Sequence, residues 1–243
     1  MKLLALETST ERLSFAIVDG ERRFAREVDA GQRHSELTLP MLHDILAEAE
    51  MTIADMDALA FGQGPGSFTG VRIACGFTQG MALGSGRPVV PVQTQMALAE
   101  QCRQATGASK VVVALDARMG EIYFAAYIWQ DESWQQAVPP LLVRPERLPP
   151  IDGDGWHGIG SGYDSALLAP ALAAAYGGQI IAISRGALPR AADVATIAVR
   201  QIEQLGIGSA LSAGLAAPLY LRNKVAMTID ERRAQHAQKV AAS

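Results

Sequence analysis

Phe61-Gly62-Gln63-Gly64-Pro65-Gly66-Ser67-Phe68-Thr69-Gly70-Val71-Arg72 joins two apolar segments of different kinds. Residues 59–61 read as the end of a buried strand, and residues 71–83 read as a helix. A glycine-rich turn between a strand and a helix directs backbone N–H groups outward, where they attract anions. The stretch therefore predicts a strand-loop-helix unit whose loop is either an anion site or a rigid turn.

Individual residues of this loop have readable roles. Gly64 and Gly66 allow backbone angles that are closed to other residues, and Pro65 between them stiffens the turn. Ser67 or Thr69 can cap the helix that follows, because a side-chain oxygen there can accept from a free backbone N–H. The candidate anion or interface loop comprises Thr8, Ser9, Gly64, Pro65, Gly66, Ser67, Phe68, Thr69 and Gly70.

The composition limits the class of protein. The chain has 243 residues, 49% of them hydrophobic, and a formal net charge of −4. No apolar run approaches the roughly 18–20 residues of a membrane-spanning helix. Cys75 and Cys102 fall in helix-like segments, so we expect buried free thiols and a cytoplasmic protein. Without a basic field, any nucleic-acid role is expected to go through a partner.

The first half of the chain alternates strands and helices, which predicts a largely parallel sheet with helices on its faces. Three strands at the N-terminus form a meander, and Asp19-Gly20 makes one of its turns. The predicted strands are residues 2–6, 13–18, 22–28, 58–61 and 88–92. The first predicted helix begins near His34, with Ser35 as its cap. Two more predicted helices span about residues 69–84 and 94–106.

The pattern restarts after residues 107–110. We expect strands at 111–115, 121–128 and 180–183, turns at 116–120 and 158–162, and helices at 165–175 and 191–205. Five prolines predict an irregular connection over residues 139–155. This gives an α/β fold in two lobes: 1–107 with the 190–206 helix packed back on it, and 108–189. Residues 207–243 follow as a C-terminal segment, with a mobile tail after Asn223.

The second predicted helix carries a stripe of glycines. Gly76, Gly80 and Gly84 are spaced i, i+4, i+8, and Arg72 lies one turn earlier. Each interior glycine costs roughly 0.5–1 kcal/mol relative to alanine, and the stripe leaves a groove for another helix. The groove packs either against the protein itself or against a partner helix.

Three familiar kinds of catalytic site do not match the motifs. His34 and His43 lie on opposite sides of a helix, and no Cys–His pair has ligand spacing, so no protein-built metal site is expected. Ser67 does not lie in the elbow of a serine hydrolase. The loop also lacks the Lys-Ser/Thr pair of a P-loop and the register of a dinucleotide fingerprint.

A fourth class, the actin-like sugar kinases and heat-shock ATPases, fits better but incompletely. Glu7-Thr8-Ser9 lies where such proteins have a phosphate turn with an acidic residue for the metal. Asp116-Ala117-Arg118 offers the acid of the second turn, then places a bulky cation where glycine should admit phosphate. The two half-built turns predict a relative of these ATPases without catalytic residues.

Several motifs together resemble the bacterial TsaB (YeaZ) family. They are the 64–72 nonapeptide, Leu6-Glu7-Thr8-Ser9, His34-Ser35, residues 114–123 (Ala-Leu-Asp-Ala-Arg-Met-Gly-Glu-Ile-Tyr) and Pro218-Leu219-Tyr220-Leu221-Arg222. The resemblance implies the two-lobed actin-like/sugar-kinase/Hsp70 (RNase H-like) ATPase-type fold in a catalytically degenerate form. It also implies a part in making N6-threonylcarbamoyladenosine at position 37 of tRNAs that read codons beginning with A.

The resemblance further implies a set of partners. The family's catalytic subunit TsaD binds a metal through a His-x-x-x-His motif after the strand that here ends at Val92, where this chain has Gln93-Thr94-Gln95-Met96-Ala97. The chain therefore resembles the accessory subunit, which pairs with TsaD, is joined by the ATPase TsaE and meets tRNA only through the complex. No cofactor of its own is implied, although ATP or ADP can bind at the joint with TsaD and TsaE.

The family pairs through helices of its first lobe, which favours the glycine stripe as an interface. The residues expected there are Leu39, Leu42, Leu46, Arg72, Gly76, Gly80 and Gly84. The same surface could form a homodimer when TsaD is missing. Two other functions stay open at this point: an active actin-like kinase or ATPase, and a protease.

Overall fold

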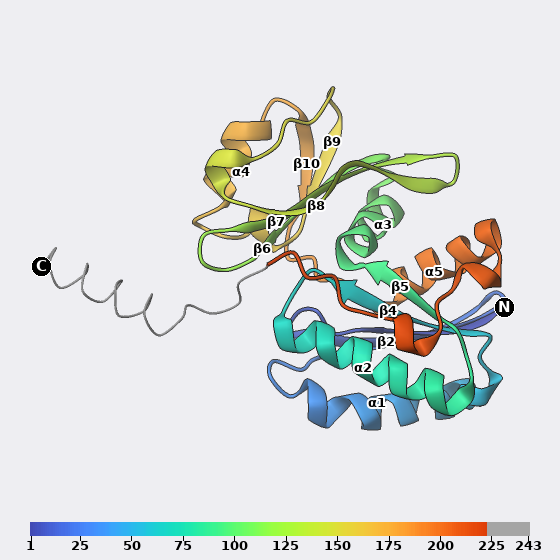
Figure 1. The fold of residues 1–243 in the computed structure, drawn as a ribbon. Coiled ribbons are helices and arrows are strands. Elements are labelled where there is room, and N and C mark those ends of the chain that lie inside the picture. The colour runs from blue at the N-terminus through green and yellow to red at the C-terminus, as the bar shows by residue number, and fades with distance from the viewer. Residues whose placement is uncertain (223–243) are drawn as a thin grey trace, which may run out of the picture.

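Two five-stranded sheets form the frame of the computed structural model, which describes residues 1–222 (Figure 1). The predicted α/β fold in two lobes is confirmed. The expected tail after Asn223 lies outside the described residues. The domain limits stay a prediction.

The first sheet has the order β3-β2-β1-β4-β5. Its strands are β1 (Lys2–Glu7), β2 (Arg12–Asp19), β3 (Arg22–Asp29), β4 (Ala58–Gly64) and β5 (Val89–Gln93). The first three are antiparallel, whereas β4 and β5 run parallel to β1. This register brings the end of β1 beside the end of β4, so Glu7-Thr8-Ser9 and the glycine loop meet at one edge of the sheet.

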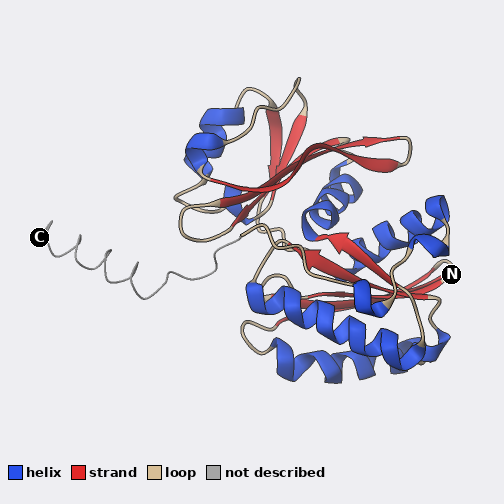
Figure 2. Ribbon diagram, in the orientation of Figure 1, coloured by secondary structure: helices blue, strands red, loops and turns tan. Residues whose placement is uncertain are grey.

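Helices cover both faces of this sheet, as Figure 2 shows. The helices are α1 (His34–Ala49), α2 (Phe68–Ser85), α3 (Thr94–Thr106) and α5 (Ala191–Leu205). One buried cluster joins α1 and α2 to one face, and a second joins α5 and the start of α3 to the other. The amphipathic pattern that predicted the 191–205 helix also accounts for its docking on β1, β2 and β4.

The second sheet has the order β10-β9-β6-β7-β8. Its strands are β6 (Lys110–Asp116), β7 (Ile122–Gln130), β8 (Ser133–Val143), β9 (Trp156–Ile159) and β10 (Ile180–Ser184). Helix α4 (Ala169–Tyr176) covers one face, while α3 packs on the other and so lies between the two sheets (Figure 1). Short 3-10 turns complete the described chain: Ile53–Asp55, Pro145–Arg147, Ser161–Tyr163, Ile207–Ser209 and Ala213–Leu215.

Four predictions about local structure were wrong. The helix expected from residue 165 begins only at Ala169, as α4. The irregular connection expected from residue 139 is strand as far as Val143, because β8 is an edge strand whose ladder is irregular near Pro139 and Pro140. β9 occupies the start of the turn expected at 158–162. The cap expected at Ser35 is absent, since α1 begins at His34 and its N-cap residue Arg33 makes no side-chain capping bond.

Beyond α5 the chain returns along the first lobe and reaches the second. Leu211 pairs with Val89, and the turn at Ala213–Leu215 packs on α2. Residues 216–222, which we call the strap, then pass beside the glycine loop, where Leu219 N donates to Gln63 O at 2.7 Å. Figure 1 shows this red segment running between the lobes.

Candidate interlobe cleft and helix interface

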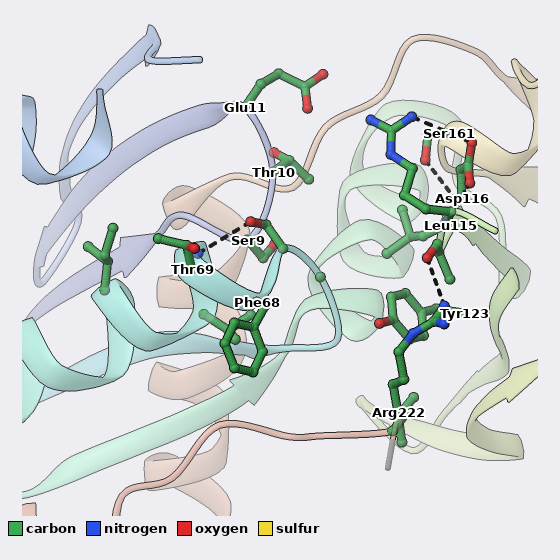
Figure 3. A pocket seen from close by; sticks show the side chains of 18 of the residues that line it. Ser9, Thr10, Glu11, Phe68, Thr69, Leu115, Asp116, Tyr123, Ser161 and Arg222 are labelled. Carbon is green, nitrogen blue, oxygen red and sulfur yellow. Dashed lines mark hydrogen bonds and ion pairs between the residues drawn. The ribbon is translucent and has the colours of Figure 1, made fainter. Parts of the chain in front are cut away.

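A cleft of about 800 Å³ separates the two lobes (Figure 3). The turn at 9–11 and the loop at 66–71 form one wall, and residues 115–119 with Tyr123 form the other. The strap contributes its residues 219–222 to the lining. Figure 3 shows the two walls facing one another, so both half-built turns identified in the sequence do border one cleft.

The glycine loop is bonded tightly to the turn after β1. Ser67 N donates to Ser9 O at 2.7 Å, and Thr8 Oγ1 donates to Gly70 O at 2.8 Å. Ser67 is the N-cap of α2, where its hydroxyl accepts from Gly70 N at 3.4 Å. Two of these bonds occupy backbone N–H donors, those of Ser67 and Gly70, that an anion would otherwise meet, which favours the rigid-turn interpretation of the loop.

Close packing accounts for three glycines of this region. A Cβ at Gly62 would overlap the Glu7 carboxylate, and one at Gly66 or Gly70 would overlap the backbone oxygen of Ser9 or Thr8. Gly64 has the positive φ, +99°, that the sequence suggested, but Gly66 does not. Sequence reasoning missed Gly62 because the group that excludes its side chain comes from another strand.

The acidic residue of the first turn points into the protein. Glu7 is fully buried, and its carboxylate accepts from Ser9 N and, at 3.1 Å, from Thr94 Oγ1. Burial raises the pKa of Glu7 above its ordinary value, and the hydrogen bonds from Ser9 and Thr94 offset part of that effect. Glu7 therefore ties β1 to the start of α3 and does not line the cleft.

The second half-built turn, Asp116-Ala117-Arg118, is closed by hydrogen bonds of its own residues and of Ser161. Asp116 Oδ1 accepts from Arg118 N at 2.7 Å, and Asp116 N donates to Ser161 Oγ at 3.0 Å. The Arg118 guanidinium lies 4.0 Å from Asp116 Oδ2 and is 88% exposed. Arg222 of the strap donates to Ala117 O at 2.9 Å, which holds the turn from the other side (Figure 3).

Within residues 1–222 no group of three His, Cys, Asp or Glu side chains is arranged to hold a metal ion. Among the same residues, no helix is long and apolar enough to span a membrane.

The predicted stripe lies on the outer face of α2. Gly76, Gly80 and Gly84 are exposed, and a Cβ on any of them would meet no atom within 4 Å. Helix α1 runs beside α2 (Figure 1). Within the described residues the stripe has no internal neighbour, so packing against the protein itself does not explain it.

The leucines expected beside the stripe are placed differently from one another. Leu39 is 63% exposed on α1, and Leu46 is partly buried against the core. Leu42 is only 4% exposed and packs inside the first lobe, so its assignment to an interface was wrong. Leu83, 73% exposed on α2, is a surface leucine that the sequence reasoning missed.

Arg72 is held by aromatic rings. Its Nε donates to Tyr220 Oη at 2.7 Å, and its guanidinium lies 3.7 Å from the ring centre of Phe68 and 5.6 Å from that of Tyr220. Such stacking on aromatic faces is favourable for arginine. Arg72 therefore attaches the strap to the start of α2. The sequence did not indicate this contact, because 148 positions separate Arg72 from Tyr220.

A buried cluster, which we call the ionic hub, joins the two lobes through Glu100, Arg103, Trp129, Trp134 and Arg200. Glu100 of α3 is fully buried and accepts from Arg103 at 2.7 Å, from Trp134 Nε1 of β8 at 2.8 Å and from Arg200 of α5 at 3.4 Å. Trp129 lies 4.1 Å and 4.5 Å from the two guanidinium groups. Burial alone would raise the pKa of Glu100, but these hydrogen bonds and the Arg200 charge lower it to about 2.

Comparisons with known proteins agree with this architecture. A family model described as "TsaD: tRNA N6-adenosine threonylcarbamoyltransferase" matches residues 28–233. The tRNA threonylcarbamoyladenosine biosynthesis protein TsaB of Escherichia coli K12 is 36% identical over 232 residues, covering 93% of this chain and 96% of that protein. The protein of the same name from Haemophilus influenzae is 34% identical, with 93% and 95% covered.

Two solved structures are also similar to this chain over most of its length. YeaZ from Pseudomonas aeruginosa superposes with a TM-score of 0.79 at 35% identity, over 90% of this chain and 99% of that one. A second structure, described as an uncharacterized protein with similarity to peptidase YEAZ from Pseudomonas aeruginosa, gives a TM-score of 0.80 at 35% identity. It covers 91% of this chain and 99% of that one.

Proposed function

The chain belongs to the TsaB (YeaZ) family, with its two-lobed actin-like fold, and on this premise we propose that it is a non-catalytic partner of TsaD. With TsaE, the pair would form N6-threonylcarbamoyladenosine at position 37 of tRNAs that read codons beginning with A. We place the complex in the cytoplasm, with tRNA bound only through the assembly. In isolation the same helix face would form a homodimer.

The exposed glycine face of α2 carries this proposal. Glycine in the interior of an exposed helix costs stability, and nothing in the described chain covers Gly76, Gly80 and Gly84. A helix from another protein can approach such a surface closely, because no side chain projects from it. Leu39 of α1 and Leu83 of α2, both exposed, would bury apolar area against that helix.

The geometry of the cleft supports placing the chemistry in the partner. Glu7 faces inward, so the acid that would position a metal is used as an internal tie. Gln93 to Ala97, at the start of α3, contain no histidine, and Gln93 Oε1 accepts from Tyr127 Oη at 2.9 Å. The α2 N-terminus still borders the cleft, and we propose that ATP or ADP binds there only at the joint with TsaD and TsaE.

Gly80→Leu is the substitution that tests the interface. The new side chain would fill the groove, so we expect at least about a tenfold loss of affinity for TsaD, or about 1.4 kcal/mol. The fold should persist, because Gly80 has open space around it. Isothermal titration calorimetry with purified TsaD measures the affinity, and thermal unfolding checks the fold.

Gly178→Leu is the matched control, since Gly178 also has no atom within 4 Å of a Cβ and lies in the second lobe. It should leave the affinity for TsaD unchanged. Equal affinity for TsaD in wild type and Gly80→Leu would remove the interface assignment. ATP turnover by the isolated protein, or proteolysis abolished by a single serine substitution, would instead support the kinase or protease alternative.

A further inference from the structure

The strap is bonded to the first lobe at several places along its length. Leu219 N donates to Gln63 O at 2.7 Å, and Tyr220 Oη accepts from Arg72 Nε at 2.7 Å. The ring centre of Tyr220 also lies 6.0 Å from that of Phe68. Loss of any one of these contacts leaves the others in place, so the strap stays on the first lobe.

Among the residues that the structure describes, the Arg222 side chain makes every polar contact between the strap and the second lobe. Its Nη2 donates to Ala117 O at 2.9 Å and lies 2.8 Å from Glu121 Oε2, and its Nη1 lies 3.3 Å from Met119 Sδ. The side chains of Arg222 and Glu121 are 16% and 21% exposed, so solvent screens this ion pair less than a surface pair. The attachment of the strap to the second lobe therefore depends on one side chain.

The turn that Arg222 contacts is itself rigid. Ala117 N donates to Glu121 O at 3.0 Å, and Glu121 N donates to Arg118 O at 3.1 Å. Asp116 Oδ1 accepts from Arg118 N at 2.7 Å, and the antiparallel pairing of β6 and β7 begins directly beside the turn. A displacement of Arg222 would therefore move the second lobe together with this turn.

The two ends of the strap contact opposite walls of the cleft. Phe68 lines the first wall, Ala117 lines the second, and residues 219–222 line the cleft between them. Figure 3 shows the Arg222 side chain pointing from the strap to the second-lobe wall. Two residues of chain, from Tyr220 to Arg222, extend at most about 7 Å. With both ends bonded, the walls cannot move far apart on this side.

The ionic hub is a second joint between the lobes, made by other elements. None of its five residues lines the cleft, whereas residues 219–222 of the strap do. Two lobes that are joined on one side of a cleft can open by rotation about that joint, unless a second connection bridges the cleft. The strap provides such a connection.

We propose that the strap limits how far the cleft opens, and that the Arg222 contact makes it do so. With this contact formed, the lobes keep their present separation. When it is broken, they rotate apart about the ionic hub. The inference concerns one isolated chain and does not depend on the proposed function. In the competing interpretation the strap only packs on the first lobe, and loss of the Arg222 contact leaves the lobes in place.

The test measures a distance between the lobes by double electron–electron resonance. Spin labels are attached to Ser35→Cys on α1 and Ala166→Cys before α4, which are exposed positions in different lobes. Cys75 and Cys102 are buried, so the labels react with the introduced cysteines. Labelled chain is diluted with unlabelled chain, so that only distances within one molecule are measured.

Arg222→Ala should lengthen and broaden the distance distribution. The fraction of molecules beyond the wild-type range should rise at least about tenfold, because one hydrogen bond to a charged group contributes about that factor. Glu121→Gln removes the charge from the other lobe and should shift the distribution in the same direction. Arg12→Ala is the control, since Arg12 pairs with Glu27 at the same distance of 2.8 Å but within the first lobe.

Two results would overturn the inference: a wild-type distribution in Arg222→Ala, or an equal shift in Arg12→Ala. Circular dichroism checks that each variant is folded. If Arg222→Ala does not fold, Glu121→Gln decides, and a wild-type distribution in that variant overturns the inference. Because the distance is measured on the chain alone, a failure to bind TsaD would count against the proposed function and leave this result unaffected.

Discussion

Gly70→Ala is expected to destabilise the protein by about 3 kcal/mol, the upper end of the usual range for overpacking, even though alanine is the better helix former. The methyl group would overlap the backbone oxygen of Thr8, and moving the two segments apart would strain the neighbouring Ser67–Ser9 bond. The same overlap would weaken the Thr8–Gly70 hydrogen bond of 2.8 Å. Urea denaturation followed by circular dichroism measures the loss.

Gly80→Ala is the matched control on the same helix. Nothing lies within 4 Å of a Cβ at Gly80, so alanine should stabilise the protein by roughly 0.5–1 kcal/mol. Opposite signs for the two substitutions would show that loop glycines serve close packing and stripe glycines serve a surface. A Gly70→Ala protein as stable as wild type would contradict the tight docking of the loop on the first turn.

Glu100→Ala is expected to cost about 3–5 kcal/mol, the range observed when one member of a buried ion pair is removed. The substitution would leave Arg103 and the Trp134 indole N–H without their acceptor, and it would free Arg200 from α3. Two of the three tryptophans, Trp129 and Trp134, belong to the hub, so tryptophan fluorescence during urea denaturation includes the signal of this joint. Glu203→Ala, an exposed change on α5, should stay within about 0.5 kcal/mol of wild type.

The hub also predicts how stability depends on pH. The folded pKa of Glu100, about 2, lies below its ordinary 4.5, so the contribution is full above pH 4.5 and disappears as pH falls through 2. This difference corresponds to about 3 kcal/mol. The stability gap between wild type and Glu100→Ala should therefore narrow between pH 4.5 and pH 2. A gap that stays constant over this interval would contradict the ionic role of Glu100.

Sequence patterns predicted those helices and strands whose residue preferences agree with their place in the folded protein. β1 and α2 follow from apolar periodicity, and the Ser67 cap follows from its position before the helix. β8 was missed because its prolines argue against a strand, and only its place at the sheet edge tolerates them. β9 is four residues long and ends in the glycine-rich turn that dominated its local pattern.

The candidate site was less predictable for a physical reason. The roles of its residues depend on partners from distant segments, as in the Glu100 hub, which draws on α3, α5 and β8. Glu7 could be placed at the right turn, but its inward orientation depends on Thr94 and on the missing side chain at Gly62. By contrast, the i, i+4, i+8 spacing alone predicted that the three stripe glycines share one face of α2, and the structure then shows that this face is exposed.

Reconstitution of the reaction tests the central claim, that this chain assists a catalyst without being one. Purified TsaD, TsaE, unmodified tRNA and threonylcarbamoyl-adenylate are combined with wild-type chain, with Gly80→Leu or with no chain, and modified adenosine is measured by mass spectrometry. We expect modification with the wild-type chain, a strong reduction with Gly80→Leu, and little or none without the chain or without TsaD. Full modification without this chain, or modification by this chain when TsaD is omitted, would contradict the account.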